Sequence, residues 1–581
     1  MSKVLFVVPV FKEDLISECG GTLLLATILR ENNIDVDIYR YYESGSKEDF
    51  NSFLDTSVTN ILSADPAIVS FFCRGDVYLA NILVAKKIKE LRPEIYIVFG
   101  GPQADISAKE TIEQIPWVDY CCSGEGETTI YPLFSGLLNG EDVSSVKGLT
   151  YRTADGKVIS NPRPELIEDL DTLPFLDYSL LPQKLVEKTK ADPIPISIDV
   201  GRGCPYNCTY CSTSLFWQRK FRIKSPERII DEMKLINKQF GITQFGFDHD
   251  LFTANKARTL EFCRAFKESG LDVQWSCSSR ADTIDKETID AMAEAGMERI
   301  YLGVETGSPR MQRIIRKNLN IDKTIEIVKY LIDKGLRATV SLIYGFPEET
   351  YDDLNQTLQL VYTIYKYGSV KYQFHLCAIF PGTEYFSKYK DEMVLSENPN
   401  SQTGHLGVKE NIEFIQKHKN LFPFYYEYQS ELRSRLGVID RRVMLLFMEL
   451  YDHLITLDPE KFADKRIIDM YLNYIDANKA LLDKDTETSP LSTKKPNLVA
   501  NYVHTEYNKD DAQKVLEVLK FKDDLVKLKS EKKDITDIRI YNADIQAVIK
   551  EKTLKDISSR TSMVCITIKD RKVTCGVQYM N

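Results

Sequence analysis

Three cysteines lie close together near the middle of the chain, within residues 201–212 (GRGCPYNCTYCS). Cys204, Cys208 and Cys211 follow a C-x3-C-x2-C spacing, one thiolate short of a closed metal site. Three thiolates hold three irons of a four-iron, four-sulfur cluster and leave the fourth iron open for chemistry. A structural zinc site would need a fourth Cys or His nearby, and the next candidates are His249 and Cys263. The spacing therefore predicts a reactive iron–sulfur centre, with three buried structural cysteines as the alternative.

This segment resembles the signature of the radical S-adenosylmethionine (SAM) superfamily, C-x3-C-x-aromatic-C, with Tyr210 at the aromatic position. The resemblance implies that the amino and carboxylate groups of SAM chelate the open iron. It also implies that one electron from the cluster cleaves SAM to methionine and a 5′-deoxyadenosyl radical. The cofactors carry this chemistry, while the protein positions them and excludes competing reactions.

Alternating strands and helices follow the cysteines to about residue 380. The expected strands are 242–247, 273–276, 299–304, 337–343 and 372–380. The expected helices are 226–240, 255–269, 286–295, 321–334 and 350–365. About six β/α units of this length predict a partial (β/α)6 barrel, with its chemistry at the C-terminal ends of the strands.

Polar residues follow several of these strands. Glu305 lies in GVETGS and Gly345 in YGFPEET, which resemble SAM-contact motifs of the superfamily. Glu305 can accept hydrogen bonds from the SAM ammonium or ribose hydroxyls, and Arg280 can offer a bidentate fork to its carboxylate. We therefore expect SAM contacts from Tyr210, Asp248, Arg280, Glu305 and Gly345, with a plain surface glutamate as the alternative for Glu305.

Residues 1–140 alternate apolar strands with amphipathic helices, the pattern of a parallel sheet covered on both faces. The expected strands are 4–10, 36–39, 67–72, 95–99 and 118–122, and the expected helices are 20–30, 77–91 and 128–138. Such sheets bind ligands at the carboxyl ends of their strands, where glycines let a large flat ligand approach the backbone. No G-x-G-x-x-G follows the first strand, so a dinucleotide site is not indicated.

The glycine-rich ends of these strands resemble the cobalamin-binding domain found upstream of many radical SAM domains. The resemblance implies that the nucleotide tail of cobalamin lies in a slot between the glycines. The cobalamin contacts that it implies are Ser70, Arg74, Gly100, Gly101, Gly124, Glu125 and Gly126. The D-x-H-x-x-G motif is absent and the first histidine is His249, so the lower face of cobalt is expected to be open or met by another side chain. Arg74 and Phe11 are the candidates, with a solvated surface arginine as the alternative for Arg74.

The length of 581 residues predicts several domains. We expect a Rossmann-like cobalamin-binding domain at 1–145, a linker at 146–190, the radical SAM barrel at 191–395 and a mainly α region at 396–581 that ends in a small α+β element. In the last region the expected helices are 411–419, 426–436, 441–457, 464–482 and 509–522, with a linker at 486–497 and strands at 563–569 and 573–578. Its position suggests a role in closing the active site or in substrate recognition.

The charge and hydropathy of the chain limit which binding partners and which location are expected. A formal net charge of −10 without a basic block argues against nucleic acid. No apolar run approaches the roughly eighteen residues of a membrane span, and the N-terminus is too short and strand-like for a signal peptide. The cysteine pattern favours a reducing compartment, so we expect a cytoplasmic protein.

The resemblance as a whole implies a cobalamin-dependent radical SAM enzyme with a [4Fe-4S] cluster, SAM and cobalamin as cofactors. The leading hypothesis is methylation of an unactivated carbon of a peptide or natural-product intermediate, through methylcobalamin and a 5′-deoxyadenosyl radical. An electron donor such as flavodoxin or ferredoxin would reduce the cluster. A non-methylating rearrangement or cyclisation is the enzymatic alternative, and a cluster-bearing binding or redox-sensing protein is the alternative from another class.

Overall fold

The structure is a computed structural model of the chain. Apart from single residues, it describes residues 3–10, 20–42, 50–192, 195–396, 407–437, 441–462, 464–482, 491–530, 535–541, 562–569 and 572–579. The chain divides into two compact units, Met1–Glu348 with Tyr367–Ser430 and Glu349–Lys366 with Glu431–Asn581. The first unit contains two large sheets, which differ in how their strands are arranged.

The first sheet has the strand order β2-β1-β3-β4-β5-β6-β7 among the described residues, and its first five strands are parallel. Its strands are β1 Lys3–Val10, β2 Val36–Tyr42, β3 Pro66–Phe72, β4 Tyr96–Gly100, β5 Tyr120–Cys122, β6 Leu149–Arg152 and β7 Val158–Ser160. β6 and β7 pair antiparallel and lie within the segment predicted to be a linker. They are short and partly exposed, so they lack the apolar run by which the other strands were predicted.

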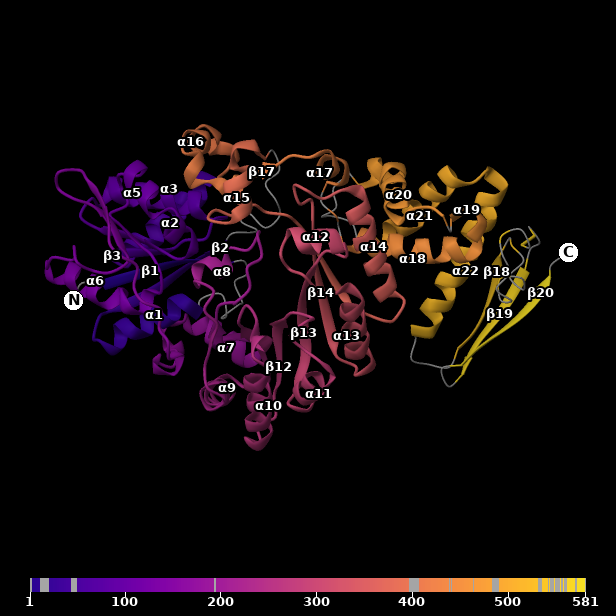
Figure 1. Cartoon of the computed structure of the whole chain (residues 1–581), viewed down its shortest axis with the longest axis horizontal. Coiled ribbons are helices and arrows are strands. Elements are labelled where there is room, and N and C mark those ends of the chain that lie inside the picture. Colours follow the sequence, from indigo (N-terminus) through magenta and orange to yellow (C-terminus); the bar gives the residue numbers. More distant parts are fainter. Residues whose placement is uncertain are drawn as a thin grey trace. The chain divides into compact units, whose positions relative to one another are not determined.

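Helices cover both faces of this sheet (Figure 1). They are α1 Gly20–Glu31, α2 Phe50–Ser63, α3 Tyr78–Leu91, α4 Pro102–Ile106, α5 Ala108–Gln114 and α6 Ile130–Asn139, followed by α7 Gln183–Ala191. α2 was not predicted, although Phe50, Phe53 and Ile61 recur at helical spacing and are buried against the sheet. β1, in the interior of the sheet, is buried along almost its whole length, and Val4 and Val7 are fully inaccessible.

The second sheet is parallel, with the order β15-β14-β13-β12-β11-β8. Its strands are β8 Ile196–Asp199, β11 Gln244–Asp248, β12 Gln274–Ser279, β13 Met297–Glu305, β14 Arg337–Tyr344 and β15 Lys371–Leu376. The helices between them in this unit are α9 Pro226–Phe240, α10 Lys256–Glu268, α11 Lys286–Glu294, α12 Pro309–Ile314 and α13 Ile321–Asp333. β15 ends four residues before the end of the predicted strand, because its partner β14 ends at Tyr344, which pairs with Leu376.

Each of these five helices begins at a residue whose side chain accepts a hydrogen bond from the first turn. The capping residues are Ser225, Asn255, Asp285, Ser308 and Asn320. Side-chain caps satisfy backbone N–H groups that have no partner within the helix. They therefore fix where each loop at the strand ends stops and the helix begins.

The segment that carries the three cysteines lies between two short antiparallel strands, β9 Gly201–Arg202 and β10 Arg222–Ile223, with the single-turn helix α8 Thr213–Phe216 between them. The first unit also contains α15 Glu384–Tyr389, β16 Met393–Leu395, α16 Ile412–Lys417 and β17 Tyr426–Tyr428. The prediction of one helix over 426–436 was wrong. Residues 426–428 pair with β16 instead, and only α17, Glu431–Leu436, is helical.

The second unit is helical and ends in a small sheet. Its helices are α14 Tyr351–Tyr365, α17, α18 Arg441–Leu457, α19 Pro459–Phe462, α20 Ile467–Leu482, α21 Leu491–Glu506 and α22 Lys509–Ser530. β18 Ile535–Tyr541, β19 Ser562–Lys569 and β20 Lys572–Tyr579 form an antiparallel sheet. The linker predicted at 486–497 is wrong from Leu491 onward, because its Ser-, Lys- and Pro-rich residues form the start of α21.

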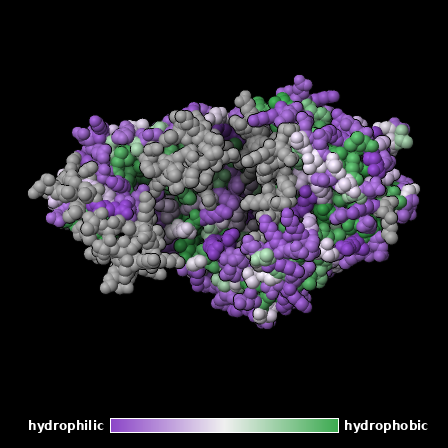
Figure 2. All heavy atoms as spheres, turned by 180° about the vertical axis from the view of Figure 1, so that it is seen from behind, coloured by the Kyte–Doolittle hydropathy of each residue, from purple (hydrophilic) through white to green (hydrophobic). Residues whose placement is uncertain are grey.

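Surface composition is mixed. On the face drawn in Figure 2, hydrophilic residues predominate and hydrophobic ones lie scattered among them. No helix among the described residues is long and apolar enough to cross a membrane.

Candidate functional site

A cavity of about 470 Å³ lies at the carboxyl ends of the first sheet and faces the second sheet. From the first sheet and its loops it is lined by Phe6, Gly21, Thr22, Leu25, Ser70, Phe71, Phe72, Val98, Gly100, Gly101, Pro102, Cys122, Gly124, Glu125, Gly126, Glu127, Thr129 and Ile130. From the cysteine segment and the second sheet it is lined by Asp199, Gly201, Arg202, Phe216, Trp217, Asp248, His249 and Asp250. The ligand-binding ends of two parallel sheets therefore meet on one cavity.

Most of the residues predicted to contact cobalamin line this cavity: Ser70, Gly100, Gly101, Gly124, Glu125 and Gly126. A Cβ added to Gly21 or Gly100 would meet no atom within 4 Å, so the backbone is open to a broad flat ligand there. Arg74 does not line the cavity, and its guanidinium binds Asp76 at 3.0 and 3.2 Å. Phe11 lies outside the described residues. The open backbone at Gly21 and Gly100 fits cobalamin, whereas a Cβ at Gly101, Gly124 or Gly126 would lie 3.0–3.2 Å from a neighbouring protein atom.

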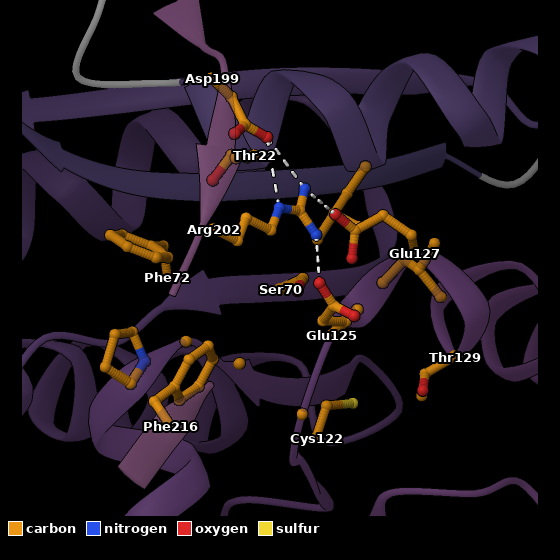
Figure 3. A pocket seen from close by; sticks show the side chains of 18 of the residues that line it. Thr22, Ser70, Phe72, Cys122, Glu125, Glu127, Thr129, Asp199, Arg202 and Phe216 are labelled. Carbon is orange, nitrogen blue, oxygen red and sulfur yellow. Dashed lines mark hydrogen bonds and ion pairs between the residues drawn. The ribbon is translucent and has the colours of Figure 1, made fainter. Parts of the chain in front are cut away.

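A buried ion-pair network crosses from the first sheet to the cysteine segment (Figure 3). Arg202 donates to Glu125 at 2.5 Å, to Glu127 at 2.6 Å and to Asp199 at 3.1 Å. Arg222 donates to both oxygens of Glu125 at 2.9 Å. The side chains of Glu125, Arg202 and Arg222 are 1, 8 and 4% exposed. Glu125 thus lines the cavity, but protein donors bind both of its carboxylate oxygens.

The three motif cysteines are partly exposed, whereas Cys73, Cys121, Cys263, Cys277 and Cys377 are buried. Within the described part of the chain no three His, Cys, Asp or Glu residues are placed to hold one metal ion. A single ion needs all its ligands at one centre, whereas the thiolates of a four-iron cluster bind separate irons. Three partly exposed thiols on one loop therefore fit a cluster whose irons they bind separately.

Backbone contacts hold the cysteine loop against the C-terminal end of α12 and against α15. Thr209 donates its N–H to the Ile315 carbonyl at 3.2 Å, and its own carbonyl accepts from Tyr385 at 3.3 Å. Gly203 has a φ of +87°, and a Cβ there would come within 2.1 Å of the Lys220 carbonyl. The glycine before Cys204 is therefore required by both backbone conformation and space.

Arg280 lies beside the cysteine loop, where its guanidinium stacks over the Tyr206 ring at 3.7 Å. It donates to Asp282 at 2.8 and 2.9 Å and to the Lys317 carbonyl at 2.7 Å. Its Nη1 is buried and has no hydrogen-bond partner. Buried donors without partners are rare, so this nitrogen marks a place for an acceptor such as the carboxylate of SAM.

Glu305 ends β13 in a left-handed conformation, with a φ of +68°. Its Oε1 accepts from Lys317 Nζ at 2.9 Å, and both side chains are 9% exposed. Burial, followed by the nearby Glu305 carboxylate, raises the pKa of Tyr210. The Tyr210 ring packs edge-on against Phe346, which follows Gly345. The structure thus brings Tyr210, Arg280, Glu305 and the Gly345 loop to one region at the strand ends.

Lys317 was not predicted. It belongs to a loop after α12 that carries no motif, and the residues on both sides of it, Arg316 and Asn318, have positive φ angles. Residues 316–320 (RKNLN) have the composition of an ordinary surface loop. The sequence therefore does not predict that Lys317 is buried, which follows only from the folding of this loop against Glu305.

Asp248 lies at the cavity, away from any ion pair that the structure records. Burial raises its pKa to about 6, and the neighbouring carboxylates Asp199 and Asp250 contribute to the shift. Burial lowers the pKa of the adjacent His249 to about 4. Asp248 is therefore largely ionised at neutral pH and takes up a proton as the pH falls through about 6.

Comparison with known proteins agrees with this architecture. The Radical SAM superfamily profile matches residues 198–361, and the B12 binding domain profile matches residues 20–133. A protein of Pyrococcus horikoshii named uncharacterized methyltransferase PH0819 is 34% identical over 62% of this chain and 76% of its own length. The anaerobic magnesium-protoporphyrin IX monomethyl ester cyclase of Rubrivivax gelatinosus is 28% identical over 47% of this chain, and the match spans only half of the cyclase.

The solved structure of the cobalamin-dependent SAM radical enzyme OxsB with aqua-cobalamin has the same fold, with a TM-score of 0.60 and 16% identity over 91% of this chain and 81% of that one. The chain belongs to the radical SAM enzymes that carry a cobalamin-binding domain. Its cofactors are a [4Fe-4S] cluster, SAM and cobalamin.

The Glu125 network gives a prediction for stability. Glu125→Ala removes the shared partner of two buried arginines and should lower the free energy of unfolding by about 3–5 kcal/mol, measured by urea unfolding of the apoprotein. Glu168→Ala is the control, because its exposed ion pair with Lys220 in the same segment contributes little. Equal stability of the two variants would contradict the network's role.

Asp248 gives a prediction for pH dependence. Its folded pKa of about 6 lies above the value of about 3.9 for an unfolded aspartate, so the stability due to its protonation is lost as pH rises through that window. The melting temperature of Asp248→Asn should therefore exceed that of the wild type by a difference that grows as pH rises from about 4 to about 6. Above about pH 6 this difference should stay constant. Asp142→Asn is the control, because hydrogen bonds to Ser144 lower the pKa of Asp142, so its pH-dependent contribution lies below about pH 4 and its difference from the wild type should stay constant between about pH 4 and 6. A gap for Asp248→Asn that does not depend on pH would refute the assignment.

Proposed function

We propose that this enzyme is a methyltransferase that uses SAM and cobalamin to methylate an unactivated carbon of a small molecule or peptide. The observation that carries the proposal is the cavity at which the glycine-lined ends of the first sheet meet the second sheet and the cysteine segment. The glycine-lined wall of this cavity would hold the corrin beside the cysteine segment. The methyltransferase name of the archaeal relative supports the same reaction.

Bound together, the cluster and SAM supply reductive cleavage of SAM, and cobalamin supplies a carrier for the methyl group. We assign Cys204, Cys208 and Cys211 to the cluster. These partly exposed thiols, on a loop with a fixed backbone, would hold three of the cluster's irons.

The charged groups beside the cysteine loop suit the amino-acid part of SAM. Arg280 presents the partnerless Nη1 to a carboxylate, and Lys317 holds a second positive charge nearby. Glu305 presents a carboxylate to the ammonium group, in an orientation fixed by Lys317 and by its strained backbone. Tyr210, Asp248 and the Gly345 loop complete the proposed SAM contacts.

The partners and location follow from this chemistry. Reduction of the cluster requires a one-electron donor, for which a flavodoxin or ferredoxin is suited. A low-potential cluster on exposed thiolates is stable in a reducing compartment, so we place the enzyme in the cytoplasm. We further propose that residues 1–145 act as the cobalamin domain and 191–395 as the radical domain.

The SAM contacts can be tested by binding. Arg280→Ala should weaken SAM binding to the cluster-loaded protein about thirty- to a hundredfold, because a charge-assisted hydrogen bond to a carboxylate is lost. Anaerobic equilibrium dialysis with SAM would measure this. Arg258→Ala is the control, since that exposed arginine binds only Glu261 on the surface of α10. Equal affinities would show that Arg280 does not meet SAM.

The reaction itself can be tested with methyl-labelled SAM. The reduced, cobalamin-loaded enzyme should transfer the label to a carbon of its substrate, detected by mass spectrometry, and should form 5′-deoxyadenosine. The Cys204→Ala, Cys208→Ala, Cys211→Ala triple variant should do neither. Formation of 5′-deoxyadenosine with an altered but unlabelled product would instead establish the rearrangement or cyclisation alternative.

A further inference from the structure

Two segments around the three cysteines contain basic residues and no acidic ones, although the chain as a whole has a formal net charge of −10. Residues 200–226 include five Arg or Lys residues, and residues 306–320 include three arginines and one lysine. The lysine, Lys317, is buried and bound to a carboxylate of the site. The three arginines of the second segment are exposed, and we call them the arginine stripe: Arg310, Arg313 and Arg316.

The arginine stripe runs along α12 (Figure 1) and the turn that follows it. Its residues are spaced three apart, so they lie on one side of the helix. The other side carries Met311 and Ile315, which are fully buried. Both belong to an apolar cluster against which Tyr210 of the cysteine loop packs. The stripe is therefore the outer surface of a layer whose inner surface contacts the cysteine loop.

The backbone that carries the stripe also contacts the cysteine loop directly. The carbonyl oxygen of Arg316 lies 3.9 Å from Sγ of Cys208, and the Ile315 carbonyl accepts from the N–H of Thr209 at 3.2 Å. None of the three arginines lines the cavity between the two sheets. An electron that enters at the stripe therefore reaches the cysteine loop without passing through the cavity.

The contacts of the stripe leave positive charge on this surface. Arg316 donates to both oxygens of Glu384 on α15 at 2.7 and 3.0 Å, and both side chains are about half exposed. Arg310 donates to the backbone carbonyl of Glu348. Arg313 makes no ion pair with any residue that the structure describes, so its charge is available to a partner. Exposed ion pairs contribute little to stability, so Arg316 can also exchange its partner at low cost.

Reductive cleavage of SAM consumes one electron, which another protein must supply. Redox proteins form small, transient complexes, and charge complementarity sets how fast such partners associate. An enzyme with a net charge of −10 repels an acidic donor over most of its surface. A local basic surface over the cysteine loop reverses that repulsion at the position where the electron is needed.

We propose that the arginine stripe is the docking surface for an acidic one-electron donor protein of the flavodoxin or ferredoxin class. This inference rests on the proposed function, which requires a donor, and it assigns the surface that the donor binds. The donor loses one electron and the cluster gains it, and no proton or bond is exchanged. The donor binds outside the cavity, which stays free for the other cofactors and the substrate.

The rate of cluster reduction tests the docking surface without methyl transfer. The cluster-loaded double variant Arg313→Glu, Arg316→Glu is mixed anaerobically with a reduced acidic bacterial flavodoxin and, in a parallel assay, with a reduced acidic bacterial ferredoxin. At about 50 mM salt, the second-order rate constant should be at least about tenfold lower than for the wild type. Added salt should slow the wild type much more than the variant.

The matched control is the double variant Arg258→Glu, Arg264→Glu, which changes two exposed arginines of α10 and alters the net charge equally. Its rate should stay within about twofold of the wild type, because the local surface and not the total charge guides the donor. Photoreduced 5-deazaflavin, a small neutral reductant, should reduce all three proteins at similar rates. That result shows that each variant keeps a reducible cluster.

Three results would overturn the docking surface. They are equal rates of the two double variants with the protein donors, reduction of the wild type by deazaflavin but by neither protein donor, and competition by a short DNA duplex as strong as that by oxidised flavodoxin. Methyl transfer driven by deazaflavin bypasses the stripe and tests the proposed function separately. If the wild type transfers no label under these conditions, the methyltransferase function fails, and the reduction rates still decide where the donor binds.

Discussion

The buried ion-pair network of Glu125, Arg202 and Arg222 is the constraint on which the site depends. Burying one carboxylate and two guanidinium groups costs free energy that is recovered only when all three meet in the observed geometry. Glu125 belongs to the first sheet, and both arginines flank the cysteine segment. A shift of one sheet relative to the other would leave these buried charges without partners. The network therefore favours the arrangement in which the strand ends of both sheets face a common cavity.

The four residues Gly201–Cys204 therefore each have a separate task. A Cβ added to Gly201 would lie only 2.6 Å from the carbonyl oxygen of Arg222, so the glycine allows β9 to pair closely with β10. Arg202 binds the first sheet, and Gly203 turns the chain in a left-handed conformation. Cys204 then begins the cluster loop. Placing the interdomain link two residues from the first thiol makes the cavity and the cluster loop parts of one local structure.

Sequence patterns predicted the parallel strands well because Val-, Ile- and Phe-rich runs between capped helices leave few alternatives. The sequence patterns gave wrong predictions where the local composition of a segment differs from what is typical of the element that it forms. β6 and β7 are short and half exposed, and α21 begins with residues typical of a linker. At the site, Arg280 and Glu305 follow strands and could be inferred, whereas Lys317 is buried only by a loop that folds back onto Glu305. Glu125 was associated with cobalamin from its glycine-rich surroundings, but its two arginine partners lie far along the chain.

The charge balance beside the cysteine loop explains why strain is tolerated there. Glu305 and Lys317 neutralise each other, and Asp282 neutralises Arg280. The local net charge is thus close to zero, yet Arg280 Nη1 remains without a partner and Glu305 is held in a backbone conformation that costs about 1–2 kcal/mol. A zwitterion adds an ammonium and a carboxylate without changing that balance. The pairs therefore balance the charge of these buried groups, and under the proposed assignment they offer one donor and one acceptor to the amino-acid part of SAM.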